Sequence, residues 1–193
     1  MTGSTNLKFA SLHDVELSAL AATGERHAFG ELVRRHGSAV RALLRRMGAQ
    51  ASEADDVAQD AFLTAFERIA EFRGEGTFVA WVKRIAARAY LRRLQKERRI
   101  GAFAAESAQD DPPPRGDADA AIDLDGALKE LGAGERICVS LCFGAGLSHA
   151  EAAEALNLPL GTVKSHVKRG LDKLRARLAP GGGEALEGRR GNG

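Results

Sequence analysis

The chain has 193 residues, of which 44% are apolar and 28% are charged, and its formal net charge is +2. This length suits one ordinary domain or two small ones, and no stretch approaches the ~20 apolar residues that a membrane-spanning helix needs. The first twenty residues contain one basic residue, Lys8, and are interrupted by His13, Asp14 and Glu16, which is unlike a secretory signal. We therefore expect a cytoplasmic protein without a membrane segment.

Apolar residues recur at helical spacing through the first hundred residues. Ser11, Ser52 and Thr77 are residue types that cap helices, and Gly24 and Gly48 are suited to end them. The stripes predict four helices, over residues 12–22, 29–47, 52–69 and 77–94.

Residues 101–121 differ in character from the rest of the chain. The run from Asp110 to Asp117 contains three consecutive prolines and three aspartates, so it cannot be helical and has too few apolar residues to pack. The helical pattern resumes at Ile122, and the glycine-rich end should be disordered. The predicted fold is all-α, with two small helical domains (1–100 and 122–179), an extended acidic linker between them (101–121) and a disordered tail (180–193).

The charges are segregated along the sequence. Between Lys83 and Arg99 there are eight basic residues and one acid. Between Lys164 and Arg177 there are six basic residues and one acid. The stretch 101–135 between them has nine acids and two basic residues. Two basic stretches separated by an acidic one indicate two contacts with a polyanion, although a charge run alone is usually a solvated face.

A helix-turn-helix pattern lies in the second basic stretch. Ser148 and Glu151 have the spacing of a capping box, residues 157–161 form a tight turn, and a second helix begins near Thr162. Its packing stripe contains Val163 and Val167. The residues left toward solvent at the end that enters a major groove are Thr162, Lys164, Ser165, His166, Lys168 and Arg169. An ordinary helical hairpin with a soluble face is the alternative.

The two cysteines, Cys138 and Cys142, are four residues apart in a helical pattern. That spacing is poor for a disulfide, and we interpret them as small buried side chains. A metal site that borrows His149 is the alternative, and no further ligands cluster to support it. No catalytic set, phosphate-binding glycine loop or metal-ligand spacing is visible, so neither an enzyme nor a cofactor is expected.

Residues 160–170, with Leu174 and Arg175, resemble region 4 of the extracytoplasmic-function sigma factors of bacterial RNA polymerase. Residues 55–63, followed by Phe78, Trp81 and Ile85, are similar to region 2 of the same family. The resemblance covers roughly residues 12–100 and 122–179, in the right order. It implies a transcription initiation factor that binds core polymerase and directs promoter recognition and DNA opening.

The resemblance also implies a role for each set of residues. The clamp of the largest polymerase subunit would bind the helix that carries Asp55, Asp56, Gln59, Asp60 and Phe62, with Phe62 as an exposed anchor. The alternative is a solvated acidic face with Phe62 in the core. The −10 element would meet Trp81, Lys83, Arg84, Arg88 and Arg92. A core position for Trp81, which lies on the apolar stripe of its helix, is the alternative. The −35 element would meet the residues at the start of the second helix of the helix-turn-helix. The implied partners are core polymerase, promoter DNA and, as an open question, an anti-sigma factor.

The chain departs from the family pattern at three positions. Arg88 stands where the family commonly has Asn, Arg92 where it commonly has Asp, and His166 where it usually has Arg. Arg84, Arg88, Arg92 and Lys96 share one helix face, which predicts that DNA phosphates lie along it unless an acid such as Glu67 or Glu71 neutralises it. His166 also resembles the helix-turn-helix of quorum-sensing response regulators. A transcriptional regulator of that type is the alternative function, although the first half lacks the strand-like runs of their α/β domains.

Overall fold

The computed structural model describes residues 9–96 and 124–178, and in these ranges the chain forms helices and turns without any strand. The N-terminal elements are α2 (Asp14–Ala22), α3 (Arg26–Met47), α4 (Ala51–Glu67), the 3₁₀ turn η1 (Ile69–Glu71) and α5 (Phe78–Lys96). The C-terminal elements are α7 (Leu124–Lys129), α8 (Ala133–Val139), the π-helical turn η3 (Ser140–Gly144), α9 (His149–Leu156) and α10 (Leu160–Leu178). The all-α prediction is confirmed. The predicted linker and tail lie outside the described residues, and none of the described helices is long and apolar enough to cross a membrane.

Two helices begin at residues other than the expected caps. The cap of α2 is His13 instead of Ser11, and that of α4 is Gln50 instead of Ser52. In each case a glutamate three residues further on accepts a hydrogen bond from the cap's backbone N–H: Glu16 Oε2 lies 2.7 Å from His13 N, and Glu53 Oε2 lies 3.4 Å from Gln50 N. The position of the glutamate therefore fixes the start of these helices more than the serine does.

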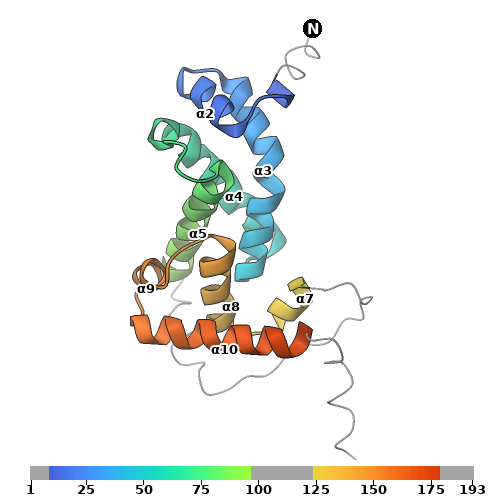
Figure 1. The fold of residues 1–193 in the computed structure, drawn as a ribbon, viewed down its shortest axis with the longest axis vertical. Coiled ribbons are helices and arrows are strands. Elements are labelled where there is room, and N and C mark those ends of the chain that lie inside the picture. Colours follow the sequence, from blue (N-terminus) through green and yellow to red (C-terminus); the bar gives the residue numbers. More distant parts are fainter. Residues whose placement is uncertain (1–8, 97–123, 179–193) are drawn as a thin grey trace, which may run out of the picture.

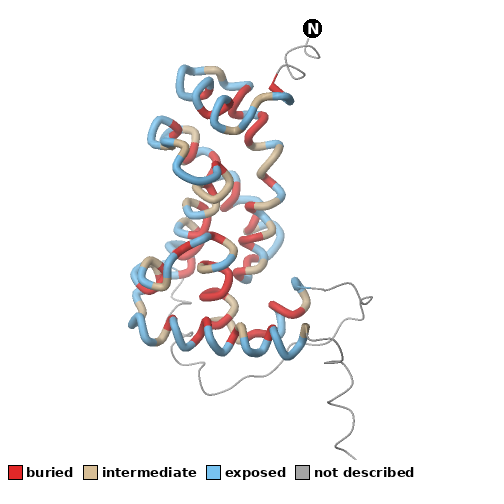
Figure 2. Tube along the Cα trace, viewed as in Figure 1, coloured by how far each residue is buried: buried red, intermediate tan, exposed pale blue. Residues whose placement is uncertain are grey.

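Helices α3, α4 and α5 pack around an aromatic cluster, with α2 lying across one end (Figure 1). Phe78 is fully buried, and its ring centroid lies 6.3 Å from that of Phe29 in an edge-to-face arrangement. Phe29 also meets Phe62 and Phe66 edge-on, at 6.5 and 5.0 Å. The buried faces of the helices turn toward one another and the exposed faces point outward (Figure 2). The rings and the small alanines of α4 let the three helices pack closely.

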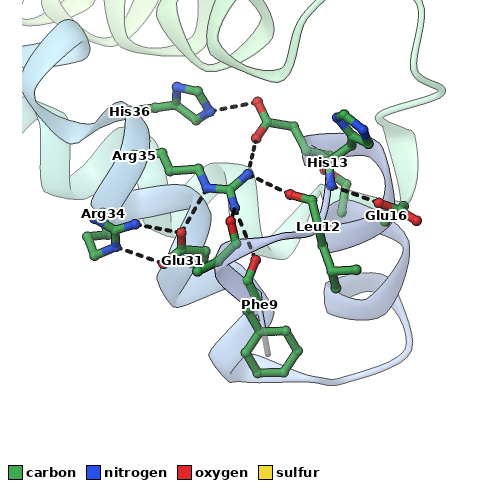
Figure 3. Close-up of polar contacts among 11 residues, drawn as sticks. Phe9, Leu12, His13, Glu16, Glu31, Arg34, Arg35 and His36 are labelled. Carbon is green, nitrogen blue, oxygen red and sulfur yellow. Dashed lines mark hydrogen bonds and ion pairs between the residues drawn. The ribbon is translucent and has the colours of Figure 1, made fainter. Parts of the chain in front are cut away.

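Arg35 on α3 fastens the segment before α2 to the bundle (Figure 3). Its guanidinium donates hydrogen bonds to the backbone oxygens of Phe9, Ala10 and Leu12, at 2.8 to 3.0 Å. Its Nε donates to Glu31, a carboxylate that is 3% exposed and also accepts two bonds of 2.7 Å from Arg34. These bonds, that of Arg34 first, lower the pKa of Glu31 to about 2 against the opposing effect of burial. Glu31 is therefore ionised and keeps Arg35 oriented toward the carbonyls.

Helices α7, α8 and α9 pack along one side of α10, which runs along one end of the molecule (Figure 1). Helix α8 packs on it where the chain has a glycine: a Cβ on Gly170 would lie 2.8 Å from a methyl carbon of Val139. Ala127, Leu128, Leu131, Val139 and Leu174 form a small apolar cluster between α7, α8 and α10. This packing leaves the first turns of α10 at the surface, next to α9.

Candidate nucleic-acid and protein interfaces

The capping box that the sequence predicts at the start of α9 is present. Glu151 N donates to Ser148 Oγ at 3.2 Å, and Ser148 N donates to Glu151 Oε2 at 2.8 Å. Asn157 ends α9 in the left-handed conformation, with φ of 54°. Helix α10 then begins at Leu160, two residues before the predicted start. The two helices form a helix-turn-helix, as predicted.

The start of α10 presents most of the predicted DNA-binding residues to solvent. Lys164, Ser165, Lys168 and Arg169 are exposed, and Thr162 is half-buried. Ser165 Oγ donates back to Gly161 O at 2.9 Å, so its hydroxyl hydrogen is already used within the helix. A surface of this kind offers cations and small polar groups to phosphates and base edges.

His166 is the exception, and its predicted role as an exposed DNA contact is not compatible with its position. The residue is only 5% exposed and its ring lies against Gly134 of α8. Arg169 Nη2 lies 3.1 Å from its Nδ1. Burial first, and then the neighbouring Arg169, lower the pKa of His166, whereas Glu135 acts in the opposite direction. His166 is therefore a neutral residue that packs α10 on α8.

Glu135 anchors α10 to α8, which the sequence did not predict. Its side chain is 8% exposed, Lys173 Nζ lies 2.9 Å from Oε2, and Arg169 Nε lies 3.5 Å from Oε1. Two cations on successive turns of α10 thus balance one nearly buried carboxylate. Arg169 is half-exposed, so this residue, predicted to contact DNA, is also an internal ion-pair partner of Glu135.

The basic face of α5, formed by Arg84, Arg88 and Arg92, is exposed, whereas Lys83 is half-buried. Trp81 is also half-buried, and its ring centroid lies 5.5 Å from that of Phe72 and 5.9 Å from that of Phe78. Trp81 therefore belongs to the edge of the aromatic cluster and still reaches the surface.

The acids that face this basic surface come from α9 instead of from Glu67 or Glu71. Glu71 pairs with Arg68 on the neighbouring turn. Arg84 Nη1 lies 3.8 Å from Glu151 Oε1, and Arg84 Nη2 donates to Gly146 O at 2.7 Å. The backbone and hydroxyl hydrogen bonds of Ser148, and then Arg84 and Arg88, lower the pKa of Glu151. A cleft of about 310 Å³ separates the two helices. It is lined by Arg88, Leu91, Arg92, Glu151, Glu154 and Ala155.

Helix α4 carries an acidic face with one large exposed apolar residue, Leu63. Asp55, Asp56, Gln59 and Asp60 are all exposed, as predicted for a protein-binding surface. Phe62, predicted to be an exposed anchor, is 6% exposed and packs edge-on against Phe29, so that prediction is wrong. The next residue, Leu63, is 56% exposed. Adjacent residues differ by about 100° around a helix, which places Leu63 beside the acids and Phe62 in the core.

The two cysteines are free thiols. Burial, and then the proximity of Cys142, raise the pKa of Cys138 to about 12, and burial raises that of Cys142. Both remain protonated and unreactive near neutral pH. Within the described residues, no group of three or more potential ligand side chains is placed to hold a metal ion.

Two family profiles match the chain, Sigma-70 region 2 over residues 32–100 and Sigma-70 region 4 over residues 127–176. The chain is 34% identical over 176 residues to RNA polymerase sigma factor NccH of Alcaligenes xylosoxydans xylosoxydans, covering 86% of this chain and 94% of that protein. It is 33% identical over 166 residues to ECF RNA polymerase sigma factor SigM of Mycobacterium tuberculosis, covering 86% of this chain and 83% of that protein.

Among solved structures, the chain is similar to CnrH in complex with the cytosolic domain of CnrY. The TM-score is 0.51 and the identity is 32%, with 86% of this chain and 96% of that chain covered. The alternative of a quorum-sensing response regulator is not favoured, because both sigma profiles match in chain order and the described part of the first half contains no strand. The chain belongs to the extracytoplasmic-function sigma factors of bacterial RNA polymerase and directs transcription initiation.

Proposed function

We propose that three separate surfaces carry out the steps of initiation: the exposed face of α4 binds core polymerase, α5 contacts the −10 element, and the start of α10 reads the −35 element. The observation that carries this division is the segregation of charge among exposed helix faces. The α4 face contains acids, whereas the exposed polar residues on α5 and at the start of α10 are mainly cationic.

For core polymerase, we propose that Leu63 replaces Phe62 as the apolar anchor. Asp56 and Asp60 would meet basic groups on the clamp of the largest subunit, which aids association and orientation. A central apolar contact surrounded by such charges excludes water and contributes most of the affinity. Leu63 is the large apolar side chain on this face that is exposed to a partner.

For the −35 element, we propose that Lys164 and Lys168 bind phosphates and that Ser165 and Arg169 approach base edges. Thr162 contributes from the first turn. His166 acts indirectly, because it packs between α8 and α10 and sets the orientation of α10. Arg169 then both touches His166 and faces outward.

For the −10 element, we propose that the α5 basic face binds the phosphates of the opened strand. Lys83 supports it, and the exposed edge of Trp81 offers a surface on which an unstacked base can lie. Arg88 and Arg92 add charges where the family commonly has neutral or acidic residues. Phosphate contacts would therefore contribute a larger share of binding than in typical members.

The remaining proposals concern organisation and control. Residues 1–100 and 122–179 would be the two working domains, with 101–121 as an acidic linker between them and 180–193 as a tail. The chain would act in the cytoplasm, without catalytic activity or a cofactor of its own. Since CnrH has been solved with the cytosolic domain of CnrY, we also propose that an anti-sigma factor binds this chain.

Two variants with opposite expected defects test the division. Asp56→Arg reverses a charge on the α4 face, and Lys168→Ala removes a charge from α10. With purified core polymerase, Asp56→Arg should co-elute less on gel filtration, whereas Lys168→Ala should co-elute normally and fail in promoter-dependent transcription. If Lys168→Ala lost core binding while Asp56→Arg retained it, the surfaces would be assigned to the wrong partners.

A further inference from the structure

The guanidinium of Arg169 contacts two residues of the protein at once. Its Nε lies 3.5 Å from Glu135 Oε1 on α8, and its Nη2 lies 3.1 Å from Nδ1 of His166, one turn earlier on α10. A guanidinium can only donate hydrogen bonds, so the imidazole nitrogen is the acceptor. Burial first, and then Arg169, lower the pKa of His166. The ring is therefore neutral, and Nδ1 keeps the lone pair that Arg169 needs.

The carboxylate of Glu135 is placed under α10 by the close approach of the two helices. A Cβ built on Gly170 would lie 2.8 Å from a methyl carbon of Val139 and 3.5 Å from Glu135 Cβ. The side chain of Glu135 is only 8% exposed, and its two oxygens reach Arg169 and Lys173 on successive turns of α10. Because close packing fixes the position of the carboxylate, Glu135 can hold Arg169 in one orientation.

These contacts leave the outer edge of the Arg169 guanidinium for a partner. Both contacts use the edge with Nε and Nη2, while the side chain as a whole is 51% exposed. Nη1 and the second hydrogen of Nη2 form the other edge, which presents two parallel N–H groups. Such a pair fits O6 and N7 of guanine, and this is the commonest specific contact between an arginine and a base.

An arginine that is ordered before it binds loses less side-chain entropy on binding. Ordering one long side chain at an interface corresponds to about twofold to tenfold in affinity. The advantage applies only to a base that accepts both bonds, so it increases discrimination between bases. His166 stands where the family usually has arginine, and an arginine has no acceptor. The contact between Arg169 and His166 is thus a feature of this chain.

We propose that Glu135 and His166 are positioning residues that hold Arg169 ready to bind a guanine of the −35 element. Both are at least nine-tenths buried, so they act through Arg169 and not by touching the base. Discrimination between guanine and the other bases at one position of the element then depends on a carboxylate of α8, outside the helix that reads the DNA. This inference rests on the proposed −35 role of α10.

Three substitutions of acids test the role of Glu135. Glu135→Met removes both oxygens and keeps an unbranched side chain of similar length, whereas Glu135→Gln keeps an amide oxygen that can accept from Arg169. Glu130→Met is the matched control, because Glu130 pairs with Arg177 near the other end of α10. Each full-length chain is assembled with core polymerase and incubated with a library of duplex DNA randomised over both promoter elements. The bound DNA is then sequenced.

We expect the wild-type complex to prefer guanine at one −35 position by at least about fivefold. Glu135→Met should reduce this preference by about threefold or more and leave the preferences at the other positions unchanged. Glu135→Gln should retain more of it, and Glu130→Met all of it. A folded Glu135→Met chain with the wild-type guanine preference would overturn the proposal. A uniform loss of affinity with unchanged preferences would also overturn it, because that is the effect of a merely structural residue.

A measurement on the free chain covers the case in which Glu135→Met does not fold. Nitrogen-15 relaxation of the arginine Nε–H groups reports how ordered each guanidinium is. We expect Arg169 to be more ordered than Arg175, which pairs with Asp172 at the surface of the same helix. His166→Phe keeps a ring without the acceptor, so it should loosen Arg169 and weaken the guanine preference. Equal mobility of Arg169 and Arg175 in the wild-type chain would overturn the proposal.

Arg169→Ala separates this inference from the function on which it rests. If this variant keeps every base preference of the wild-type complex, Arg169 does not read a base, and the inference fails together with that part of the −35 role. If it loses a preference for a base other than guanine, the bidentate contact inferred above is wrong. If it loses the guanine preference while Glu135→Met and His166→Phe keep it, the role of Arg169 stands and the positioning by Glu135 and His166 is overturned.

Discussion

A Cβ built on Gly134 would lie 3.0 Å from Cε1 of His166, so the imidazole of α10 rests directly on the backbone of α8. Glycine in a helix is unfavourable by about 1 kcal/mol relative to alanine, yet here its missing side chain makes room for the ring. The residue that departs from the family pattern is thus matched by a glycine on the facing helix.

Gly134→Ala should therefore destabilise the chain in spite of its better helix propensity. The gain of about 1 kcal/mol is smaller than the typical cost of about 1–3 kcal/mol for overpacking a close contact. Urea unfolding of Gly134→Ala should show a lower free energy of unfolding than that of the wild-type chain. Adding His166→Ala to Gly134→Ala should remove this loss, because the ring that the new Cβ meets is gone. Gly161→Ala, where a Cβ meets no described atom within 4 Å, is the control and should be neutral or stabilising. Equal behaviour of the two alanine variants would contradict the packing role of Gly134.

The buried imidazole also predicts a pH dependence of stability. Burial, and then Arg169, hold the pKa of His166 below its ordinary 6.5, so the unfolded chain binds a proton at pH values where the folded chain does not. The free energy of unfolding should consequently fall as the pH drops below about 6.5 and continue to fall until the lowered folded pKa is passed.

His166→Gln isolates this contribution, because the other four histidines are the same in both chains. The measurement is urea unfolding of the wild-type and variant chains between about pH 7.5 and pH 5. The wild-type curve should lose stability more steeply toward acid than the variant curve. Parallel curves would mean that His166 is not held neutral by its surroundings.

Phe62 and Leu63 should behave in opposite ways when each is replaced by alanine. Phe62→Ala removes a buried ring and should lower the free energy of unfolding by about 3–5 kcal/mol. Leu63→Ala is a surface change and should leave stability within about 0.5 kcal/mol. If Leu63 is the anchor, its variant should lose at least ~1 kcal/mol of core-polymerase affinity, measured by titration of labelled core. Full core affinity in Leu63→Ala would contradict that role.

Local signals in the sequence predicted much of the fold. Ser148 with Glu151 gave the start of α9 because a capping box is satisfied within four residues. The glycines at 24 and 48 were expected to end helices, and both have positive φ there. Signals of this kind depend on neighbouring residues only, so they do not require knowledge of the tertiary structure.

The residues whose exposure was predicted wrongly are those whose positions depend on packing between helices that are distant in the sequence. The apolar pattern of Val163 and Val167 did not predict that His166 is buried. The buried face of α10 is wider than this one line of apolar residues, because α10 also packs against α8. Phe62 was taken as exposed because the family's docking helix and the core stripe share one helix. Its direction depends on its packing against the ring of Phe29 on another helix. The contacts of Arg84 with Gly146 and with Glu151 of α9 link residues 62 or more positions apart, which no local pattern encodes.

Alanine variants of three cations on α10 should distinguish residues that contact DNA from residues that stabilise the fold. Lys168 has its side chain exposed, and Lys173 pairs with Glu135. Arg169 also pairs with Glu135 and lies in the first half of α10, which we propose reads the −35 element. Lys168→Ala should cost about 1–3 kcal/mol of promoter affinity in the polymerase complex with unchanged stability. Lys173→Ala should cost about 1 kcal/mol of stability, a modest value because water screens the half-exposed ammonium. Arg169→Ala should show both losses.

Arg175→Ala is the matched control for this series, since Arg175 is on the same helix and pairs with Asp172 at the surface. An exposed ion pair of that kind contributes little, so neither stability nor promoter affinity should change measurably. Urea unfolding of the free chain and promoter titration of the assembled complex give the two readouts separately. A loss of promoter affinity in Lys173→Ala with unchanged stability would assign Lys173 to DNA and would leave Glu135 balanced by Arg169 alone.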